Sequence, residues 1–556
     1  MGRTCSGYRE DSSLVFRNET SSTMSRPRRR ARELSEPPAA PETPLSPYSD
    51  TRDRSETQEP TIHLSSYHAH SQYLATAAEP TTNHSSPVSL PRSASAFPSS
   101  KGLMTSGRPT RSPAELLDQS SSTPQLPSPA STSGTIADVG IAHFMENFVV
   151  SGSGPSPGFC DYAIAAYNDR RTDDCAIYAA VQAVGLAALA NKSGGVVYAR
   201  EAQAQYGNAL TKINAALLDP GEANRDSTVL AIIVLGLYET ITCVDDESIA
   251  AWSKHVDGAA NLLVHRGTSQ FETSIGLEIF KVAVAHLLVS YSRLQLPLPP
   301  RIRLLRMEAS RLIKATDPLW ALCSAHIEVL DLNSQVDPDR KDPFLEKDWA
   351  RFLLRALELD GRIEGYFANL DTKWQYKIVI DPSAEPSMVF RGKLHIYHDI
   401  WVAKVWNGMR SCRMILNDII RALLDRECST WNAKEAGPGG TYAGLYEKSI
   451  ATMRTLRDDL LASAPQMLGH VYHEATTSTT IFNYKCTTKP PSGAALGAFF
   501  IQWHLYLAGT LPFNSPETKA WIIDRLHHIR VTTGMKKAQY LAERLEKDAL
   551  FSSDVQ

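Results

Sequence analysis

Proline is distributed very unevenly along this chain of 556 residues, and its distribution limits where a packed core can form. Of the 33 prolines, 15 lie between Pro37 and Pro129, in a stretch that is also rich in Ser, Thr and Ala. Such a stretch buries too little apolar surface to offset the entropy lost when its backbone is ordered. We therefore expect residues 1–32 to be an N-terminal arm, residues 33–135 a disordered linker, and residues 136–550 the folded domain.

The expected folded domain carries one helix-length apolar segment after another, separated by the residues that interrupt helices. The predicted helices are 176–190, 198–218, 228–241, 248–266, 276–292, 304–313, 319–332, 349–366, 394–424, 446–462, 492–507 and 517–550. Strand candidates such as Lys377–Ile380 are short and few. The pattern predicts a large all-α domain, and no fixed-period repeat supports a solenoid.

The segment that begins near Ser248 has the clearest helical pattern. Its apolar stripe advances by four, three and four residues, and consists of Trp252, Val256, Ala259 and Leu263. We expect this stripe to face the core. Ser248 is placed to cap this helix, and Asp226-Ser227 to cap the preceding one. Arg266-Gly267 predicts a basic last turn followed by a left-handed C-cap.

Charge and cysteine content exclude several classes of protein. The formal net charge is −3 and the pI about 6.6, so the whole chain is no electrostatic nucleic-acid binder. The cysteines are far apart in the sequence, which favours free thiols in a reducing compartment over a disulfide framework. They are Cys5, Cys160, Cys175, Cys243, Cys323, Cys412, Cys428 and Cys486. We expect no secretory signal and no membrane-spanning segment, because the apolar runs are too short.

Catalytic motifs are scarce, and we predict no enzyme activity and no catalytic residue. The sequence has no phosphate-binding GxxxxGK[ST] loop, no HExxH and no GxSxG elbow. The run from Asn417 to Asp425 loosely resembles the second metal-binding box of terpene cyclases, but Arg421 stands where a Ser or Thr is needed. Neither Asp245-Asp246-Glu247 nor Asp458-Asp459 completes such a site. A helix with solvated acidic side chains explains the run more simply.

Metal-binding patterns are equally weak. There is no CxxC, and the pairs His395/His398 and His527/His528 have no cysteine partners. Surface or packed histidines account for both pairs. Five tryptophans on apolar helical faces are expected in the core rather than in a ligand cage: Trp252, Trp401, Trp406, Trp503 and Trp521.

A cluster of arginines is the strongest charged feature of the N-terminal arm. It consists of Arg26, Arg28, Arg29, Arg30 and Arg32. The cluster fits a nuclear localisation signal or an arm that contacts DNA phosphates, and a generic solvated basic arm is the alternative.

Three motifs in the helical region resemble those of fungal transcription regulators that carry a six-cysteine binuclear zinc cluster. They are a Tyr-Glu pair after an apolar helix, W-x-x-H-x-x-G-A, and L-L-x-x-R-G. The corresponding residues are Tyr238, Glu239, Trp252, His255, Gly258, Ala259, Leu263, Arg266 and Gly267. Phe271, Gly276 and Phe280 follow at similar positions. The order and spacing of the motifs are more specific than any one of them, and the resemblance covers nearly all of the helical region.

The N-terminus resembles the end of the zinc cluster in one branch of this family. Cys5-Ser6-Gly7-Tyr8-Arg9 and the segment 14–20 correspond to the last cysteine and the residues after it. By this resemblance Cys5 is the last zinc ligand, and the five upstream cysteines are absent. One cysteine does not supply the four ligands of structural zinc, so we expect no cofactor here unless the upstream cluster is restored. A truncated gene model, an alternative start and a regulator without its DNA reader all remain open.

The resemblance implies a nuclear regulator of transcription by RNA polymerase II, with a regulatory domain of the middle-homology type. Implied partners are the transcription machinery or co-regulators, a small-molecule effector and a second copy of the chain, with no membrane. DNA binding by the chain as written is expected to be weak. The alternatives are an interaction-only regulator that lacks DNA binding and, less favoured, an all-α enzyme of the terpene-cyclase type.

Overall fold

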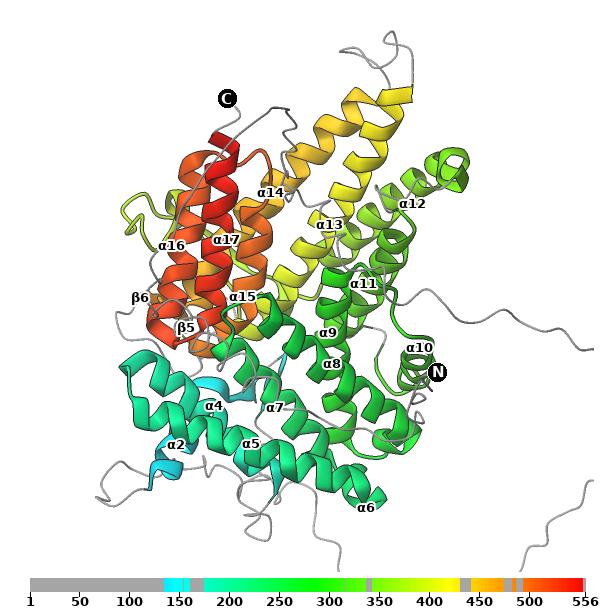
Figure 1. The fold of residues 1–556 in the computed structure, drawn as a ribbon. Helices are drawn as coiled ribbons and strands as arrows, with labels where there is room; N and C mark the ends of the chain where they lie inside the picture. Colours follow the sequence, from blue (N-terminus) through cyan, green and yellow to red (C-terminus); the bar gives the residue numbers. More distant parts are fainter. Residues whose placement is uncertain are drawn as a thin grey trace, which may run out of the picture. The chain divides into compact units, whose positions relative to one another are not determined.

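The computed structural model describes residues 135–553 apart from 154, 161–174, 315, 337–342, 431–441, 475–482 and 487–493. The described residues belong to one compact unit (Figure 1). They form fifteen α-helices and three small two-stranded sheets, which confirms the all-α fold class. The predicted arm 1–32 and nearly all of the predicted linker 33–135 lie outside the described residues.

The first eight helices are α2 (Ile136–Phe148), α4 (Ala176–Ser193), α5 (Val196–Leu218), α6 (Pro220–Ala223), α7 (Asp226–Thr242), α8 (Asp246–Arg266), α9 (Ser274–Leu294) and α10 (Pro300–Ala309). The others are α11 (Pro318–Gln335), α12 (Pro343–Ala368), α13 (Ile400–Thr430), α14 (Ala443–Met467), α15 (Ala494–Gly509), α16 (Pro516–Thr533) and α17 (Lys536–Ser553). Connections of one to three residues join the helices from α4 to α8, and the longest connection, between α12 and α13, contains a β-hairpin.

The strands pair only with their neighbours in antiparallel hairpins. These are β1 (Val150–Ser153) with β2 (Ser156–Phe159), β3 (Lys377–Ile380) with β4 (Lys393–Ile396), and β5 (Val471–Glu474) with β6 (Asn483–Cys486). In the second hairpin Ile380 pairs with Lys393. The predicted strand at Lys377–Ile380 is confirmed.

Helix α7 runs through the core, as its sequence requires. Every residue from Thr228 to Ile241 is buried, because apolar side chains occupy all sides of this helix. It packs against α4 and α8, and α4 in turn packs against α2 and α5. The approach of α2 to α4 depends on glycine: a Cβ at Gly185 would lie 1.8 Å from the carbonyl oxygen of Gly140.

The C-terminal helices complete the same core rather than forming a second one. Helices α16 and α17 lie side by side, α16 packs against α4, and α17 packs against α7 (Figure 1). Asn191, near the end of α4, donates its side-chain amide to the carbonyl oxygens of Ile241 and Gly534, both at 3.0 Å. Arg530 donates back to the carbonyl oxygen of Asn191 at 3.2 Å. One hydrophobic core therefore includes residues from both α2 and α17.

Three predicted helices are wrong in part. The segment 304–313 is helical only as far as Ala309, where α10 ends. The segment 394–424 does not begin as a helix: it starts in β4, and α13 begins only at Ile400. The segment 517–550 is two helices, because Gly534 adopts a left-handed conformation (φ 79°, ψ 6°) that ends α16. A Cβ at Gly534 would lie 2.5 Å from the carbonyl oxygen of Ala188, so the break is also a close contact with α4.

Two predicted N-caps are also wrong. The cap of α8 is Asp245, whose carboxylate accepts hydrogen bonds from the backbone and the hydroxyl of Ser248. The cap position of α7 is Arg225, which makes no side-chain cap bond, and Asp226 is already helical. At α8 the carboxylate of Asp245 takes the cap position that was predicted for Ser248. At α7 the carboxylate of Asp226 accepts a hydrogen bond from Arg266 of α8 instead of capping its own helix.

Helix α9 has the length and composition of a membrane-spanning helix. More than half of its most apolar window is buried among the other helices, as in the core helix of a globular protein. No other helix in the described ranges meets the same criteria.

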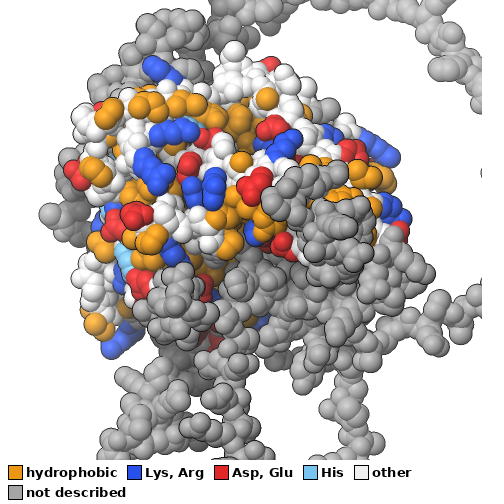
Figure 2. Space-filling model, turned by 90° about the horizontal axis from the view of Figure 1, so that it is seen from above, with side chains coloured by type: hydrophobic (Ala, Val, Ile, Leu, Met, Phe, Trp, Pro, Cys, Tyr) orange, Lys and Arg blue, Asp and Glu red, His pale blue; other side chains and the backbone are white. Residues whose placement is uncertain are grey.

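One face of the molecule shows how charge is distributed. On the face seen in Figure 2, Lys and Arg side chains are interspersed with Asp and Glu and with hydrophobic side chains. On the described part of that face no large area carries a single sign of charge. It therefore lacks the basic stripe with which a DNA-binding surface attracts phosphates.

Candidate functional site: a buried polar cluster beside a cavity

Three helices meet at a buried polar cluster that consists of Tyr206, Glu239 and His255. The Tyr206 hydroxyl, on α5, donates to Glu239 Oε1 on α7 at 2.5 Å and lies 3.1 Å from Nε2 of His255 on α8. His255 Nε2 lies 3.3 Å from the same carboxylate oxygen. All three residues are at most 5% exposed. A buried carboxylate requires such partners, so the cluster fixes α5, α7 and α8 relative to one another.

Tyrosine rings flank the cluster. Tyr238 stacks on Tyr206 with ring centroids 4.4 Å apart and planes 24° apart. Burial and the adjacent Glu239 raise the pKa of the Tyr238 hydroxyl. The Tyr-Glu and W-x-x-H motifs thus meet in space, with Tyr206 as their third member. Tyr206 was not predicted from the sequence, because nothing in the spacing within its own helix distinguishes it from an ordinary core tyrosine.

The stripe predicted on α8 faces the core, as expected. Trp252, Val256, Ala259 and Leu263 are all buried. Gly258 is buried beside them. On α7, a Cβ at Gly236 would lie 3.6 Å from the Trp252 indole, so the two helices are in ordinary van der Waals contact there.

The Arg-Gly motif ties the end of α8 to the start of α7. Arg266 is buried and donates to Asp226 Oδ1 at 2.5 Å. Gly267 has φ 61° and ψ −144°, a positive-φ conformation but not the left-handed helical one that was predicted. This region of φ and ψ is nearly restricted to glycine. Gln270 donates its side-chain amide to the carbonyl oxygens of Leu263 and Gly267 and holds the turn closed.

The three residues that follow the motif also pack together. The rings of Phe271 and Phe280 lie edge to face with centroids 5.0 Å apart. Gly276 has no space for a side chain, because a Cβ there would lie 2.1 Å from the carbonyl oxygen of Gln270. The motif residues therefore have structural roles that are visible in the fold.

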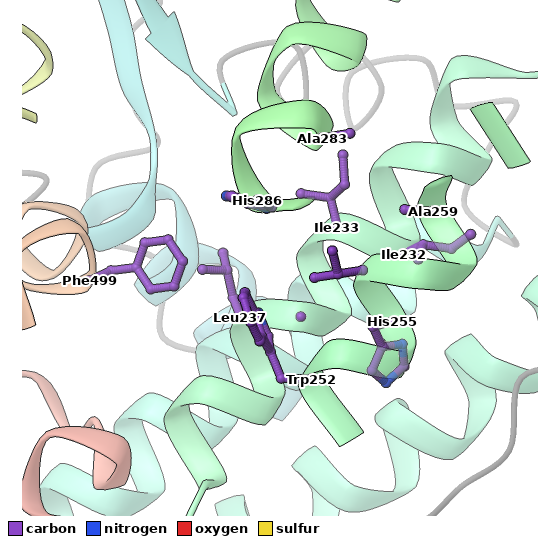
Figure 3. A pocket seen from close by; sticks show the side chains of 11 residues that line it. Ile232, Ile233, Leu237, Trp252, His255, Ala259, Ala283, His286 and Phe499 are labelled. Atoms are coloured by element: carbon purple, nitrogen blue, oxygen red, sulfur yellow. The ribbon is translucent and has the colours of Figure 1, made fainter. Parts of the chain in front are cut away.

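A small pocket of about 10 Å³ lies between α7, α8, α9 and α15 (Figure 3). Trp252 and His255 of α8, Leu237 of α7, His286 of α9 and Phe499 of α15 line it. Its volume is that of about one water molecule. It cannot hold an organic ligand.

A larger cavity of about 140 Å³ shares Trp252, His286 and Phe499 with the small pocket. Helices α9, α11, α13 and α15 form most of its wall. The apolar lining residues are Trp252, Ala285, Leu288, Val289, Leu319, Leu322, Cys323, Val405, Gly408, Cys412, Ile415, Phe499, Phe500 and Trp503. A cavity of this size and composition accommodates a benzene ring.

Two serine–histidine pairs line the same cavity. Ser292 Oγ lies 2.6 Å from His326 Nε2, and Ser411 Oγ lies 2.7 Å from His504 Nδ1. Burial lowers the pKa of His326 to about 4, and burial with nearby Lys404 lowers that of His504 to about 3. No carboxylate among the described residues hydrogen-bonds to either histidine, so neither pair has the third member of a Ser-His-Asp triad.

Two lysines also line this cavity, and both lack an acidic partner among the described residues. Lys404 as a whole residue is partly exposed, but its ammonium nitrogen is buried without a hydrogen-bond partner among the described residues. It lies 4.2 Å from the Trp401 ring centre and 4.3 Å from that of Phe500. Burial lowers the pKa of Lys404 to about 8. Lys537 Nζ lies 4.8 Å from the Trp252 ring centre.

The residues considered for metal binding are not brought together. In the described part of the chain, no group of three or more His, Cys, Asp and Glu side chains is arranged to hold a metal ion. Asn417, from the terpene-cyclase-like run, is buried and donates to Asp360 Oδ1 at 3.1 Å. Ser449 donates to Asn417 Oδ1 at 3.0 Å. The asparagine is thus occupied in packing α12, α13 and α14 together.

The two histidine pairs differ from each other. His395 lies in β4, fully buried, and its ring stacks on Tyr376 with centroids 4.4 Å apart. His398 lies outside that strand and is partly exposed. His527 Nε2 lies 2.9 Å from Glu546 Oε1, whereas the ring of His528 faces His470.

Of the five tryptophans expected in the core, Trp252, Trp401 and Trp406 are buried, and Trp503 and Trp521 are partly exposed. Cys5 and the five arginines of the arm lie outside the described residues, so their predicted roles remain predictions.

Comparison with known proteins adds one match. Residues 142–303 match the family model of the fungal specific transcription factor domain. The match covers less than a third of the chain, from within α2 to within α10, and includes every motif residue from Tyr238 to Gly267. No curated protein and no solved structure matches the chain.

Proposed function

We propose that this protein is a nuclear regulator of transcription by RNA polymerase II, and that residues 136–550 are its regulatory domain. The observation that carries the proposal is the match of residues 142–303 to a fungal transcription factor domain. The geometry supports it, because the residues that resemble the family's motifs meet at the cluster of Tyr206, Glu239 and His255 and at the contact of Arg266 with Asp226.

We infer that the helical domain acts as an interaction module rather than as an enzyme. Its polar cluster is buried among three helices and offers no surface to a substrate. Its two Ser–His pairs lack a carboxylate among the described residues. We therefore place co-regulators or the transcription machinery among its partners, and homodimerisation is included in the proposal.

DNA binding by the chain as given depends, in this proposal, on the arm alone. Its five arginines are Arg26, Arg28, Arg29, Arg30 and Arg32. Five phosphate contacts correspond to a slope of about −4.5 in a plot of log affinity against log salt concentration. Base reading needs side chains held rigidly at the groove edges, so binding is expected to show no sequence preference. Titrating labelled duplexes of different sequence at several salt concentrations distinguishes this from a specific DNA binder.

Rapid depletion of the protein in the cells that encode it tests the regulatory role. Nascent RNA measured within minutes of depletion should change for a defined set of genes, before indirect effects accumulate. A variant with all five arm arginines replaced by alanine tests whether the arm directs nuclear import, and we expect this variant to lose its nuclear accumulation. If nascent transcription does not change on depletion, the proposed function is wrong.

An interaction-only regulator is the second candidate, favoured by the mixed charge of the surface in Figure 2. It predicts that the same genes respond to depletion, whereas cross-linking places the protein on chromatin only through a partner. Loss of chromatin occupancy when that partner is removed supports this alternative.

A further inference from the structure

The cavity of about 140 Å³ has a charge that nothing in the described structure balances. Lys404 and Lys537 both line it, and no Asp or Glu is among the described residues of its wall. The other ionisable side chains of that wall, among the described residues, are histidines and cysteines. The wall therefore carries two lysines and no acidic side chain among its described residues, and most of its other residues are apolar.

The position of Lys404 explains why this charge matters. Its ammonium nitrogen lies between the rings of Trp401 and Phe500, with no hydrogen-bond acceptor among the described residues. Contacts with aromatic faces offset only part of the cost of burying a cation. An ammonium group in such a place gains substantially when an anion reaches it.

Most other polar groups of the wall already have partners. The hydroxyls of Ser292 and Ser411 are engaged with His326 and His504. By contrast, Oε1 of Gln502 is buried without a hydrogen-bond partner among the described residues. Two buried polar atoms of the wall are thus open among the described residues: the Lys404 ammonium, which suits an anion, and this amide oxygen, which suits a hydroxyl group elsewhere on the ligand.

We propose that this cavity binds a small apolar carboxylic acid in its anionic form, with its hydrocarbon part against the aromatic and aliphatic wall and its carboxylate on Lys404. The volume limits the hydrocarbon part to about the size of a benzene ring, since an apolar cavity of about 150 Å³ is known to hold benzene. The four-carbon stem of Lys404 lets the ammonium turn from the rings toward the carboxylate. Lys537, on the Trp252 side, adds to the attraction for an anion.

Shared side chains connect the cavity to the polar cluster of Tyr206, Glu239 and His255. Trp252, His286 and Phe499 line both the cavity and the small pocket, and His255 of the polar cluster lines that pocket too. A ligand that orders these side chains would stabilise the packing of α8 on α7, α9 and α15. This regulatory consequence rests on the proposed function, whereas ligand binding itself does not.

Calorimetric titration of the purified full chain with benzoate tests the proposal. Benzamide and benzylammonium, which match benzoate in size, serve as neutral and cationic comparisons. We expect benzoate to bind at least about tenfold more tightly than benzamide, because a hydrogen bond to a charged group is worth more than a neutral one. Benzylammonium should not bind detectably.

Two variants locate the site. Lys404→Met keeps the stem and removes the charge, and should weaken benzoate binding by about tenfold or more while leaving benzamide binding nearly unchanged. Lys448→Met, at an exposed position of α14, is the matched control and should bind benzoate as the unchanged protein does. Ala285→Leu, which fills part of the cavity, should weaken both ligands.

Two results would overturn the proposal. One is the absence of benzoate binding at concentrations up to about 10 mM, beyond the weakest affinity expected for such a ligand. The other is benzoate binding that is unchanged in Lys404→Met. Circular dichroism shows whether each variant is folded. No transcriptional readout is involved, so failure of the proposed regulatory role and failure of this site are distinguishable.

Discussion

Tyr206 donates its hydroxyl hydrogen to Glu239 at 2.5 Å, and both side chains are almost fully buried. The two residues lie on α5 and α7, and His255 of α8 reaches the same carboxylate oxygen. This contact explains in physical terms why a Tyr-Glu pair and a W-x-x-H motif belong together. The glutamate needs donors in a dry core, and they come from two other helices.

The first prediction tests this contact. Tyr206→Phe should lower the free energy of unfolding by about 1–3 kcal/mol, because the Glu239 carboxylate loses a buried donor. Tyr540→Phe is the matched control: its hydroxyl bonds to Asp246 at the surface, and its loss should cost less than about 1 kcal/mol. Urea denaturation measures both. Equal losses of stability in the two variants would show that the buried hydrogen bond stabilises the fold no more than the surface one.

Gly267 provides a test of backbone conformation. With φ 61° and ψ −144° it occupies a region that a Cβ disfavours, although nothing lies within 4 Å of where that Cβ would stand. Gly267→Ala should therefore destabilise the domain by about 1–3 kcal/mol through strain alone. Gly361→Ala, in the exposed interior of α12, should instead stabilise it by about 0.5–1 kcal/mol. Thermal unfolding of the pair gives opposite shifts if the conformations are as described.

The cavity histidines predict how stability depends on pH. Burial lowers the pKa of His286 and of His504 to about 3, and that of His326 to about 4, from an ordinary value of 6.5. Between about pH 6.5 and pH 4 the unfolded chain binds protons that the folded chain does not. Stability should thus fall as the pH drops through this window, by up to about 1.4 kcal/mol per pH unit for each histidine.

Denaturant unfolding at pH 7, 6 and 5 measures this dependence. His504→Gln, which keeps a hydrogen-bonding group beside Ser411, should make it less steep. His527→Gln, at a partly exposed position outside the cavity, is the comparison variant. A pH dependence that is identical in all three proteins would show that folding does not lower the pKa of His504.

Lys404 should contribute with the same sign at alkaline pH, so that stability rises as the pH increases from about 8 to about 10.5. Its folded pKa of about 8 lies below the ordinary value of 10.5, so its burial is unfavourable below pH 8 and becomes neutral above about pH 10.5. Lys404→Met should therefore stabilise the domain at pH 7 by about 1–3 kcal/mol. This gain should disappear as the pH rises toward 10.5. A loss of stability at pH 7 would mean that the ammonium has a partner in the folded protein.

The sequence predicted the helices well because each amphipathic stripe is a local property. The stripe from Trp252 to Leu263 needs only the helical repeat to be recognised. The split at Gly534 was not predictable in this way. A glycine is required there because the backbone packs closely against Ala188, which is far away in the sequence. The strand at Lys393–Ile396 was missed for a similar reason, since its pairing with Lys377–Ile380 overrides a helical pattern.

The residues of the candidate site also fall into two groups, those found from local sequence patterns and those that depend on contacts between helices. Glu239, Trp252 and His255 were found through their motifs, but Tyr206 and Lys404 were not. Both of these side chains acquire their roles from residues on other helices, and a single sequence contains no periodic signal for such contacts. From its position in the sequence, Lys404 resembles a solvated lysine on an amphipathic helix. Its contact with the ring of Phe500 on α15 is visible only in the fold.

Transcription from a reporter tests the central claim most directly. The full chain, fused to an unrelated DNA-binding domain and directed to a reporter promoter, should raise or lower nascent reporter RNA severalfold relative to that domain alone. Trp252→Ala should abolish the effect, because loss of a buried indole costs about 3–5 kcal/mol. Val531→Ala, at a position that is 70% exposed, should preserve it. A fusion that is folded, nuclear and bound at the promoter, yet leaves reporter RNA unchanged, would contradict the assignment of this chain to transcriptional regulation.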